Sequence, residues 1–134
     1  MDNSLDLPSY AHPHDAAFDL RASHDCVLRP NEHALVRTGL KFAIPEGHVG
    51  LIWDRSGLAV KNKITTLGGV IDAGFRGEIA VIMMNLANED FKVEKGMRVA
   101  QMIVQPFVSC NIEETESLDD THRGEKGMGS TGLH

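Results

Sequence analysis

Residues 40–53 read LKFAIPEGHVGLIW, and the order of residue types in this stretch decides the fold class. Apolar and polar residues alternate over 40–44, which is the period of a half-buried β-strand. The Pro-Glu-Gly sequence at 45–47 then predicts a turn, because proline and glycine favour the backbone angles of tight turns. Residues 48–53 predict a second strand, so the chain is expected to run strand, turn, strand.

The same signals recur along the rest of the chain. Residues 91–95 alternate again and are followed by a glycine, and two apolar runs at 79–84 and 99–104 predict strands that are buried on both faces. The only helix expected is one or two turns over 56–61. Many short strands separated by turns predict an all-β fold, either a sandwich or a barrel.

The composition changes after Thr115. The final stretch, ESLDDTHRGEKGMGSTGLH, has few apolar residues and four glycines. A segment of this kind cannot bury enough apolar surface to become ordered on its own. We therefore predict one β domain over 1–115, followed by a flexible glycine-rich arm over 116–134.

Length and charge exclude several classes of protein. The chain has 134 residues, enough for one domain, and a formal net charge of −6. The acidic balance argues against nucleic acid or a membrane surface as the main partner. No apolar stretch approaches the roughly 18 residues of a transmembrane helix. The first residues, MDNSLDLPSYAHPHD, are polar and unlike a signal peptide, so a cytoplasmic location is expected.

Cysteine and histidine usage predicts neither disulfides nor a protein-built metal site. Cys26 and Cys110 cannot make a disulfide framework and are expected to be reduced thiols. The seven histidines are scattered along the chain. Neither an HExxH sequence nor the Cys/His spacing of zinc ligands occurs.

One carboxylate stands out in the stretch 68–81, GGVIDAGFRGEIAV, where Asp72 interrupts the apolar text of a buried strand. Taken alone, Asp72 fits two interpretations. It is either an aspartate in a turn between strands or a general base on the floor of an active site. The glycines on both sides would let the backbone bend or approach a ligand closely.

Other polar positions are open to a structural and a functional interpretation. Ser56 fits the N-cap of a short helix, Gln101 fits an edge-strand amide, and the arm fits a solvated spacer. In a phosphate-binding protein, Ser56 and the amides near Gly57 would instead face phosphate oxygens. The Gly-Ser-Thr-Gly sequence at 129–132 would wrap phosphates with N–H and hydroxyl groups, and Arg123 would add positive charge.

Five stretches together resemble a known family. They read AFDLRA at 17–22, DRSGLA at 54–59, GGVIDAGFRGEIAV at 68–81, GMRVAQ at 96–101 and RGEKGMGSTG at 123–132. Their order and approximate spacing are similar to those of the five motifs of the trimeric dUTP diphosphatases, or dUTPases. The resemblance covers nearly the whole chain, from about residue 16 to residue 132.

The resemblance implies a fold and an activity. Members of this family are β jelly rolls that form homotrimers, with three active sites at subunit interfaces and the arm of one chain closing a site built by the others. They hydrolyse dUTP to dUMP and pyrophosphate, which lowers dUTP and supplies dUMP for dTMP synthesis. The expected cofactor is Mg²⁺, held by the three phosphates and water rather than by direct protein ligands.

The resemblance also assigns roles to residues that contact water, sugar and base. Asp72 matches the general base that activates water for in-line attack on the α-phosphate. Phe75 matches an aromatic wall, usually tyrosine, that packs on the deoxyribose and leaves no space for a 2′-hydroxyl. Thr66, Gly69 and Val70 belong to the hairpin whose main-chain groups read uracil, and Thr66 stands where many members have asparagine.

Phosphate contacts are implied for three further groups of residues. Ser56, Gly57 and Gln101 match phosphate-binding positions, and Arg55 matches an arginine that braces the site. Asp19 matches an aspartate that orders water around the metal. The matching lid residues over the phosphates and the base are Arg123, Met128, Gly129, Ser130 and Thr131.

Two positions depart from the family pattern. Asp54 precedes Arg55 where proline, glycine or serine is common, and its carboxylate is expected either to turn away from the triphosphate or to pair, for example with an arginine. Met128 stands where the family usually has the phenylalanine that stacks on uracil.

Two rival functions remain open at this point. The first is dCTP deaminase, which shares the fold, but its catalytic glutamate would fall at Ile82, which cannot transfer a proton. The second is a binding or signalling trimer whose arm engages a partner and whose catalysis is incidental. The presence of all five motifs argues against it.

Overall fold

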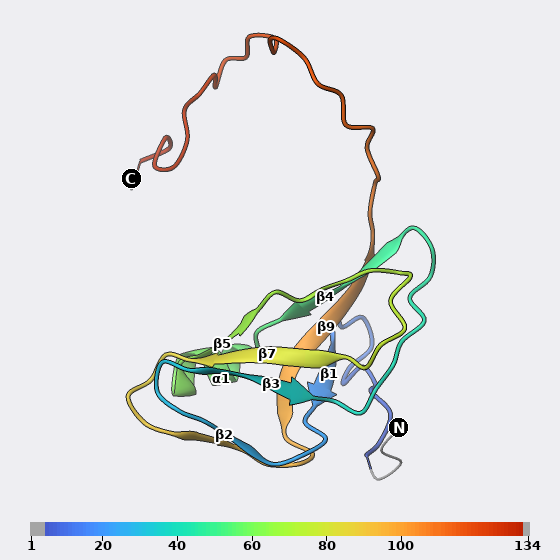
Figure 1. Cartoon of the computed structure of the whole chain (residues 1–134), viewed down its shortest axis with the longest axis vertical. Coiled ribbons are helices and arrows are strands. Elements are labelled where there is room, and N and C mark those ends of the chain that lie inside the picture. Colours follow the sequence, from blue (N-terminus) through green and yellow to red (C-terminus); the bar gives the residue numbers. More distant parts are fainter. Residues whose placement is uncertain (1–4, 133–134) are drawn as a thin grey trace.

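The structure is a computed structural model that describes residues 5–132. Within this range the chain is built from short antiparallel strands and one short helix (Figure 1). The elements are β1 Phe18–Arg21, β2 Cys26–Leu28, β3 His33–Arg37, β4 His48–Trp53, α1 Ser56–Asn62, β5 Ile64–Leu67, β6 Val70–Ile71, β7 Ala80–Asn85, β8 Phe91–Val93 and β9 Arg98–Pro106. The all-β class predicted from the sequence is confirmed.

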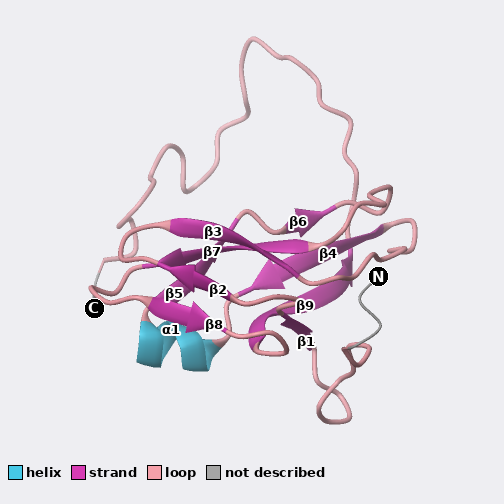
Figure 2. Ribbon diagram, turned by 60° about the horizontal axis from the view of Figure 1, so that its bottom comes forward, coloured by secondary structure: helices cyan, strands magenta, loops and turns pink. Residues whose placement is uncertain are grey.

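The strands form three antiparallel sheets, with orders β1-β9-β4-β6, β3-β7-β5 and β2-β8. In the first sheet β9 lies between β1 and β4. In the second sheet β7 lies between β3 and β5 (Figure 2). Helix α1 connects β4 of the first sheet to β5 of the second. The segment 54–63 therefore lies where the chain passes from one sheet to the other.

The core between the sheets is almost wholly aliphatic. Side chains at alternate positions of the strands point inward, for example Val81 and Met83 of β7 and Met102 of β9, each with no exposed surface. Phe18 is the one aromatic residue among the buried core residues of the described chain. Polar groups in the core are satisfied, since the buried Asn85 side chain donates to the carbonyls of Leu28 and Glu89. This rigid frame holds the loops at its ends.

Two sequence predictions about strands were wrong in detail. Residues 40–44 alternate in burial as expected, but they form no strand, because no strand pairs with their backbone and a single main-chain bond, from the Ile79 N–H to the Leu40 carbonyl, joins them to the segment before β7. Strand β7 is not buried on both faces, since its burial alternates residue by residue, and β9 is likewise exposed toward its end. The predicted strands at 48–53 and 91–95 and the helix at 56–61 are confirmed as β4, β8 and α1, with β8 ending at Val93.

A glycine corner joins the two main sheets. β5 pairs with β7 in one sheet, and β6 pairs with β4 in the other, so the chain changes sheet at Gly68 and Gly69. Both glycines have positive φ, of 65° and 98°. A Cβ added at Gly69 would lie 2.9 Å from the Ile52 carbonyl oxygen. Only glycine suits this position, because other residues rarely adopt this backbone angle and would collide with β4.

The chain leaves the domain at the end of β9. All described residues from 107 onward are exposed and belong to no helix or strand. Figure 1 shows this segment curving away from the sheets, in orange to red. The predicted division at 115/116 falls inside the segment, and positions 1–4 and 133–134 of the predicted domain and arm lie outside the described residues. Across residues 5–132, no helix has the length and apolar character needed to span a membrane.

Candidate active site

Asp72 lies in the turn that follows β6. The N–H of Phe75 donates to the Asp72 carbonyl over 3.0 Å, which closes a four-residue turn. The Asp72 side chain is exposed. The turn interpretation is therefore correct as local structure, and the turn presents the carboxylate to solvent, where a water molecule can reach it.

The ring of Phe75 sits against Gly77. A Cβ added at Gly77 would come within 2.4 Å of the ring, so the absence of a side chain at this position makes space for it. Phe75 is 44% exposed, so part of the ring is open to a ligand. Next to it, the Arg76 guanidinium donates to the carbonyls of Ala73 and Phe75, and this fixes the turn.

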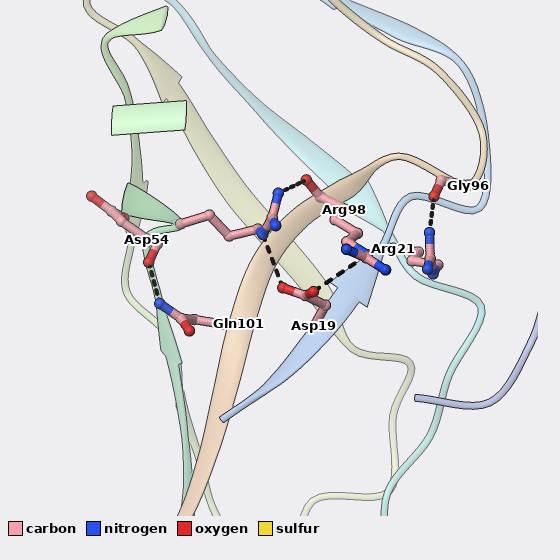
Figure 3. Close-up of polar contacts among 7 residues, drawn as sticks. Asp19, Arg21, Asp54, Gly96, Arg98 and Gln101 are labelled. Carbon is pink, nitrogen blue, oxygen red and sulfur yellow. Dashed lines mark hydrogen bonds and ion pairs between the residues drawn. The ribbon is translucent and has the colours of Figure 1, made fainter. Parts of the chain in front are cut away.

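A second group of polar residues gathers on β1, β9 and the end of β4 (Figure 3). The Arg55 Nε donates to Asp19 Oδ1 over 2.9 Å, and the Arg98 Nε lies 3.3 Å from Asp19 Oδ2. Asp19 and Gln101 are direct partners in the register of β1 with β9. Arg55 is thereby tied to β1, and its role in bracing a site stays a prediction.

Helix α1 begins at Ser56, and its N-cap is Arg55, which makes no side-chain cap hydrogen bond. The interpretation of Ser56 as the N-cap is therefore wrong, because Ser56 is already the first helical residue. Ser56 and Gly57 are both exposed. The first N–H groups of a helix have no partner inside it, so those of Ser56 and Gly57 are available to an anion.

Asp54 points away from the arginines. Its Oδ2 accepts a hydrogen bond from the Thr65 hydroxyl over 2.8 Å, and its Oδ1 accepts from the N–H and the hydroxyl of Thr66 over 2.6 and 2.7 Å. Its main-chain carbonyl accepts from the Gln101 Nε2 over 2.7 Å (Figure 3). The carboxylate is thus paired, as one alternative required, but with threonines rather than with an arginine.

The structure brings some of the predicted residues together and keeps others apart. Asp19, Asp54 and Gln101 line one open groove of about 550 Å³. Asp72 lies outside this groove. It follows Ile71, whose partner in β4 is Gly50, and because β6 and β4 are antiparallel the chain from Ile71 onward runs away from the C-terminal end of β4. Roughly 10 Å of strand separates Gly50 from the β4 end at Trp53, beyond which Arg55 and Ser56 follow.

The arm residues are not near any of these positions in the single chain. Arg123 donates through its Nε to the Lys126 carbonyl, and Ser130 donates its N–H to the Gly127 carbonyl, so the arm is folded into local turns. Met128 is fully exposed. Arg123, Met128, Gly129, Ser130 and Thr131 line a shared hollow of the arm.

Sequence reasoning missed two residues of this region. Arg98 was quoted within a motif but given no role, and Thr65 was not considered. Arg98 pairs with Asp19 only because β1 and β9 are neighbours, with a register shift between Leu20 and Arg21 that the sequence does not reveal. Thr65 and Thr66 directly follow the buried Ile64. This pair of adjacent threonines was the signal in the sequence that could have pointed to Thr65.

Among residues 5–132, no three His, Cys, Asp or Glu side chains are grouped so that they could hold a metal ion. Cys26 and Cys110 are free thiols, as expected. Asp19 is tied to the phosphate-binding segment through Arg55, and its two oxygens are engaged by arginines but retain lone pairs for water. This donor set suits a cation that reaches the site already bound to phosphate oxygens.

Comparison with known proteins identifies the family. The dUTPase family model matches residues 3–132.

The chain belongs to the dUTPase family.

Relatives in this family cover almost the whole chain. The deoxyuridine 5′-triphosphate nucleotidohydrolases of Clostridium tetani and Alkaliphilus metalliredigens are each 48% identical to it, over 94% and 99% of the chain and 88% and 94% of their own length. Solved structures of dUTPases are also similar to this chain. A Staphylococcus bacteriophage 80alpha dUTPase mutant with dUpNHpp has a TM-score of 0.88 and 28% identity, covering 96% of this chain and 93% of its own.

A second dUTPase structure bears on the metal. A mutant dUTPase from phage phi11 of S. aureus, described for its coordination of a structural Mg(II) ion, has a TM-score of 0.80 and 25% identity, covering 87% of this chain and 93% of its own. The structural matches confirm the predicted jelly-roll fold.

Proposed function

We propose that this chain is a dUTP diphosphatase that cleaves dUTP between the α- and β-phosphates and releases dUMP and pyrophosphate. The observation that carries the proposal is the family match over residues 3–132, which includes all five motifs. The names of the relatives agree with it. The residues that the motifs assign to water, sugar and phosphate, namely Asp72, Phe75, Ser56 and Gly57, are all exposed.

In this proposal Asp72 is the general base. It accepts a hydrogen bond from the attacking water and takes its proton as the bond to the α-phosphorus forms, while pyrophosphate leaves on the opposite side. Exposure of the Asp72 side chain gives water access, and the turn bond from Phe75 to its carbonyl holds the backbone in place.

Sugar and base are selected by the neighbouring segment. The Phe75 ring, seated against Gly77, packs on the deoxyribose and excludes a 2′-hydroxyl. Main-chain groups of Thr66, Gly69 and Val70 read uracil. In this proposal the hairpin closes tightly around uracil and leaves little room for the methyl group of thymine.

The triphosphate binds at the other group of residues. The N–H groups at Ser56 and Gly57 and the Gln101 amide contact phosphate oxygens. The Arg55–Asp19–Arg98 ion pairs fix the arginines beside them. The arm adds Arg123, whose guanidinium matches the geometry of a terminal phosphate.

Mg²⁺ is the proposed cofactor. When bound to the triphosphate, it neutralises phosphate charge and orients the chain of phosphates. Asp19 orders water next to that site. Together with Arg123, this offsets the net charge of −6, which would otherwise oppose the binding of a polyanion.

A homotrimer with shared sites accounts for the separation of the groups. In one chain, Asp72 and the phosphate-binding residues lie toward opposite ends of β4, and the arm reaches neither. A second copy that brings its Ser56 and Gln101 to Asp72, and a third that supplies the arm, would complete each site. The domain over 1–115 would then carry the catalytic surfaces, and the arm over 116–134 would be the lid.

The experiment that tests the function is a substrate panel of dUTP, dCTP, dTTP and UTP with Mg²⁺, scored for pyrophosphate and ammonia. We expect pyrophosphate from dUTP, far less from the other three nucleotides, and no ammonia from dCTP. Ammonia release would instead support a deaminase. That outcome conflicts with the aliphatic Ile82, which is partly buried in β7 beside the glycine corner. An absence of dUTP turnover at micromolar protein would support the binding trimer.

Replacing Met128 by Phe is expected to tighten the binding of a non-hydrolysable dUTP analogue about fivefold, with little change in kcat. An aromatic ring stacked on a base contributes roughly 1–3 kcal/mol, and a thioether contributes roughly 0.3–1.5 kcal/mol. The matched control is Leu118→Phe, which adds a ring at another exposed position of the arm. Titration of both variants and the parent would check this, and equal affinities would show that residue 128 does not cover the base.

A further inference from the structure

Asp54 stands between the two segments assigned to the substrate. It directly follows β4 and precedes the phosphate-binding residues 55–57. Its carboxylate holds Thr65 and Thr66 of β5, at the start of the uracil-reading hairpin. One side chain therefore joins the phosphate-binding segment to the hairpin that reads the base.

The glycine corner of this hairpin is held from both sides by the end of β4. On the β6 side, the Ile52 N–H donates to the Gly69 carbonyl over 2.8 Å. On the β5 side, Asp54 accepts the two bonds from Thr66. The chain between these two anchors passes through Gly68 and ends at Gly69, and glycine is the residue type with the greatest backbone freedom. The corner itself is flexible, so the position of the hairpin depends on these bonds together with the pairing of β5 with β7 and of β6 with β4.

The carboxylate is well suited to be an anchor. Burial alone would raise the pKa of the Asp54 carboxyl, but the hydrogen bonds from Thr66 and Thr65 outweigh burial and bring the pKa below its ordinary value. The group is therefore ionised at neutral pH. Hydrogen bonds to an ionised acceptor are shorter and stronger than neutral ones, in agreement with the distances of 2.6 to 2.8 Å.

The other bonds of this junction fix Asp54 itself. The Gln101 amide donates to the main-chain carbonyl of Asp54, and the next residue, Arg55, is tied to Asp19. The backbone on which the carboxylate is mounted is therefore attached to β9 and β1. Movement of the hairpin relative to the phosphate-binding segment would require the bonds from Asp54 to the threonines to break.

We propose that Asp54 is a positioning residue that fixes the hairpin at 66–70 and thereby sets how strongly the enzyme selects dUTP over dTTP. This inference rests on the function proposed above. The two substrates differ by one methyl group on the base, and a rigid pocket discriminates such a difference by roughly 10- to 200-fold. Without the bonds from Asp54, β5 is still paired with β7, but it is no longer tied to the phosphate-binding segment. The glycine corner can then shift away from the methyl group, so selectivity falls while Asp72 is left in place.

The test compares four variants with the parent chain. Asp54→Asn keeps the shape of the side chain and removes the charge. Thr65→Val removes one hydroxyl that bonds to Asp54, and Thr65→Ser keeps that hydroxyl. The control is Asp90→Asn, which makes the same chemical change at an exposed position before β8. For each protein, kcat and KM are measured with dUTP and with dTTP, together with Tm.

We expect Asp54→Asn and Thr65→Val to lower the ratio of kcat/KM for dUTP to that for dTTP by about tenfold or more, the scale of lost hydrogen bonds to a charged group. The kcat for dUTP should stay within about threefold, because a positioning residue acts on binding. Thr65→Ser and Asp90→Asn should keep the parent ratio. The double variant Asp54→Asn/Thr65→Val should lose less than the product of the two single effects, because both changes break the same bond.

Variants that lower Tm but keep the parent ratio would overturn the inference, because Asp54 would then only stabilise the fold. If Asp54→Asn does not fold, the pair Thr65→Val and Thr65→Ser decides the question by the same ratio. A parent chain that hydrolyses neither nucleotide would overturn the proposed function and this inference with it. A selective parent with equally selective variants would overturn the inference alone.

Discussion

Replacing Asp72 by Asn is expected to lower kcat for dUTP by roughly 10²–10⁴-fold, the usual contribution of a positioned general base. The amide has the shape of the carboxylate but cannot take a proton from water. The fold should be unaffected, because the Asp72 side chain is exposed and the turn is closed through its main-chain carbonyl. Steady-state hydrolysis of dUTP with Mg²⁺ measures the loss.

Two controls make this result specific. Titration of a non-hydrolysable dUTP analogue should show that the Asp72→Asn variant still binds substrate. Asp90→Asn, at an exposed position outside the site, should keep the parent kcat. Near-normal hydrolysis by Asp72→Asn would remove this residue from the mechanism, whatever the other residues do.

Truncation of the chain after Asp120 should abolish most of the activity and leave a folded trimer. The deletion removes Arg123, Met128, Ser130 and Thr131, and with them the proposed contacts to the terminal phosphate and the base. The core should remain, because β9 ends at Pro106 and every described residue from 107 onward is exposed. Hydrolysis of dUTP by the truncated chain measures the loss of activity. Circular dichroism and sedimentation check that the truncated chain is folded and trimeric. Full activity without the arm would exclude the lid role.

The sequence predicted the fold class well because hydrophobic period and turn residues are local signals. The Pro-Glu-Gly turn at 45–47 and the apolar stretch after it gave β4 at its observed bounds, and the run at 99–104 marked β9. The same signals failed at 40–44, where burial alternates but no neighbouring strand pairs with the backbone. Pairing depends on which strand lies alongside, and the period of one segment carries no information on it.

The sequence proposes the candidate site as a set of residues but does not give their arrangement. Motif order pointed to Asp72, Ser56 and Gln101, since each motif is contiguous in sequence. The contacts that arrange them join distant residues, such as Asp19 with Arg98 and Asp54 with Thr65, and depend on strand register. The threonine partners of Asp54 were missed for this reason, because the sequence suggested an arginine.

The central claim is that each active site takes its base and its lid from different chains, and mixed assemblies test it most directly. Asp72→Asn chains and chains truncated after Asp120 are each expected to be nearly inactive alone. After subunit exchange, proven by tags on the two chains, mixed trimers should regain a substantial part of the activity toward dUTP. Sites that combine Asp72 of a truncated chain with the arm of an Asp72→Asn chain would account for the recovery. No recovery in any mixture, despite proven exchange, would contradict the shared-site account.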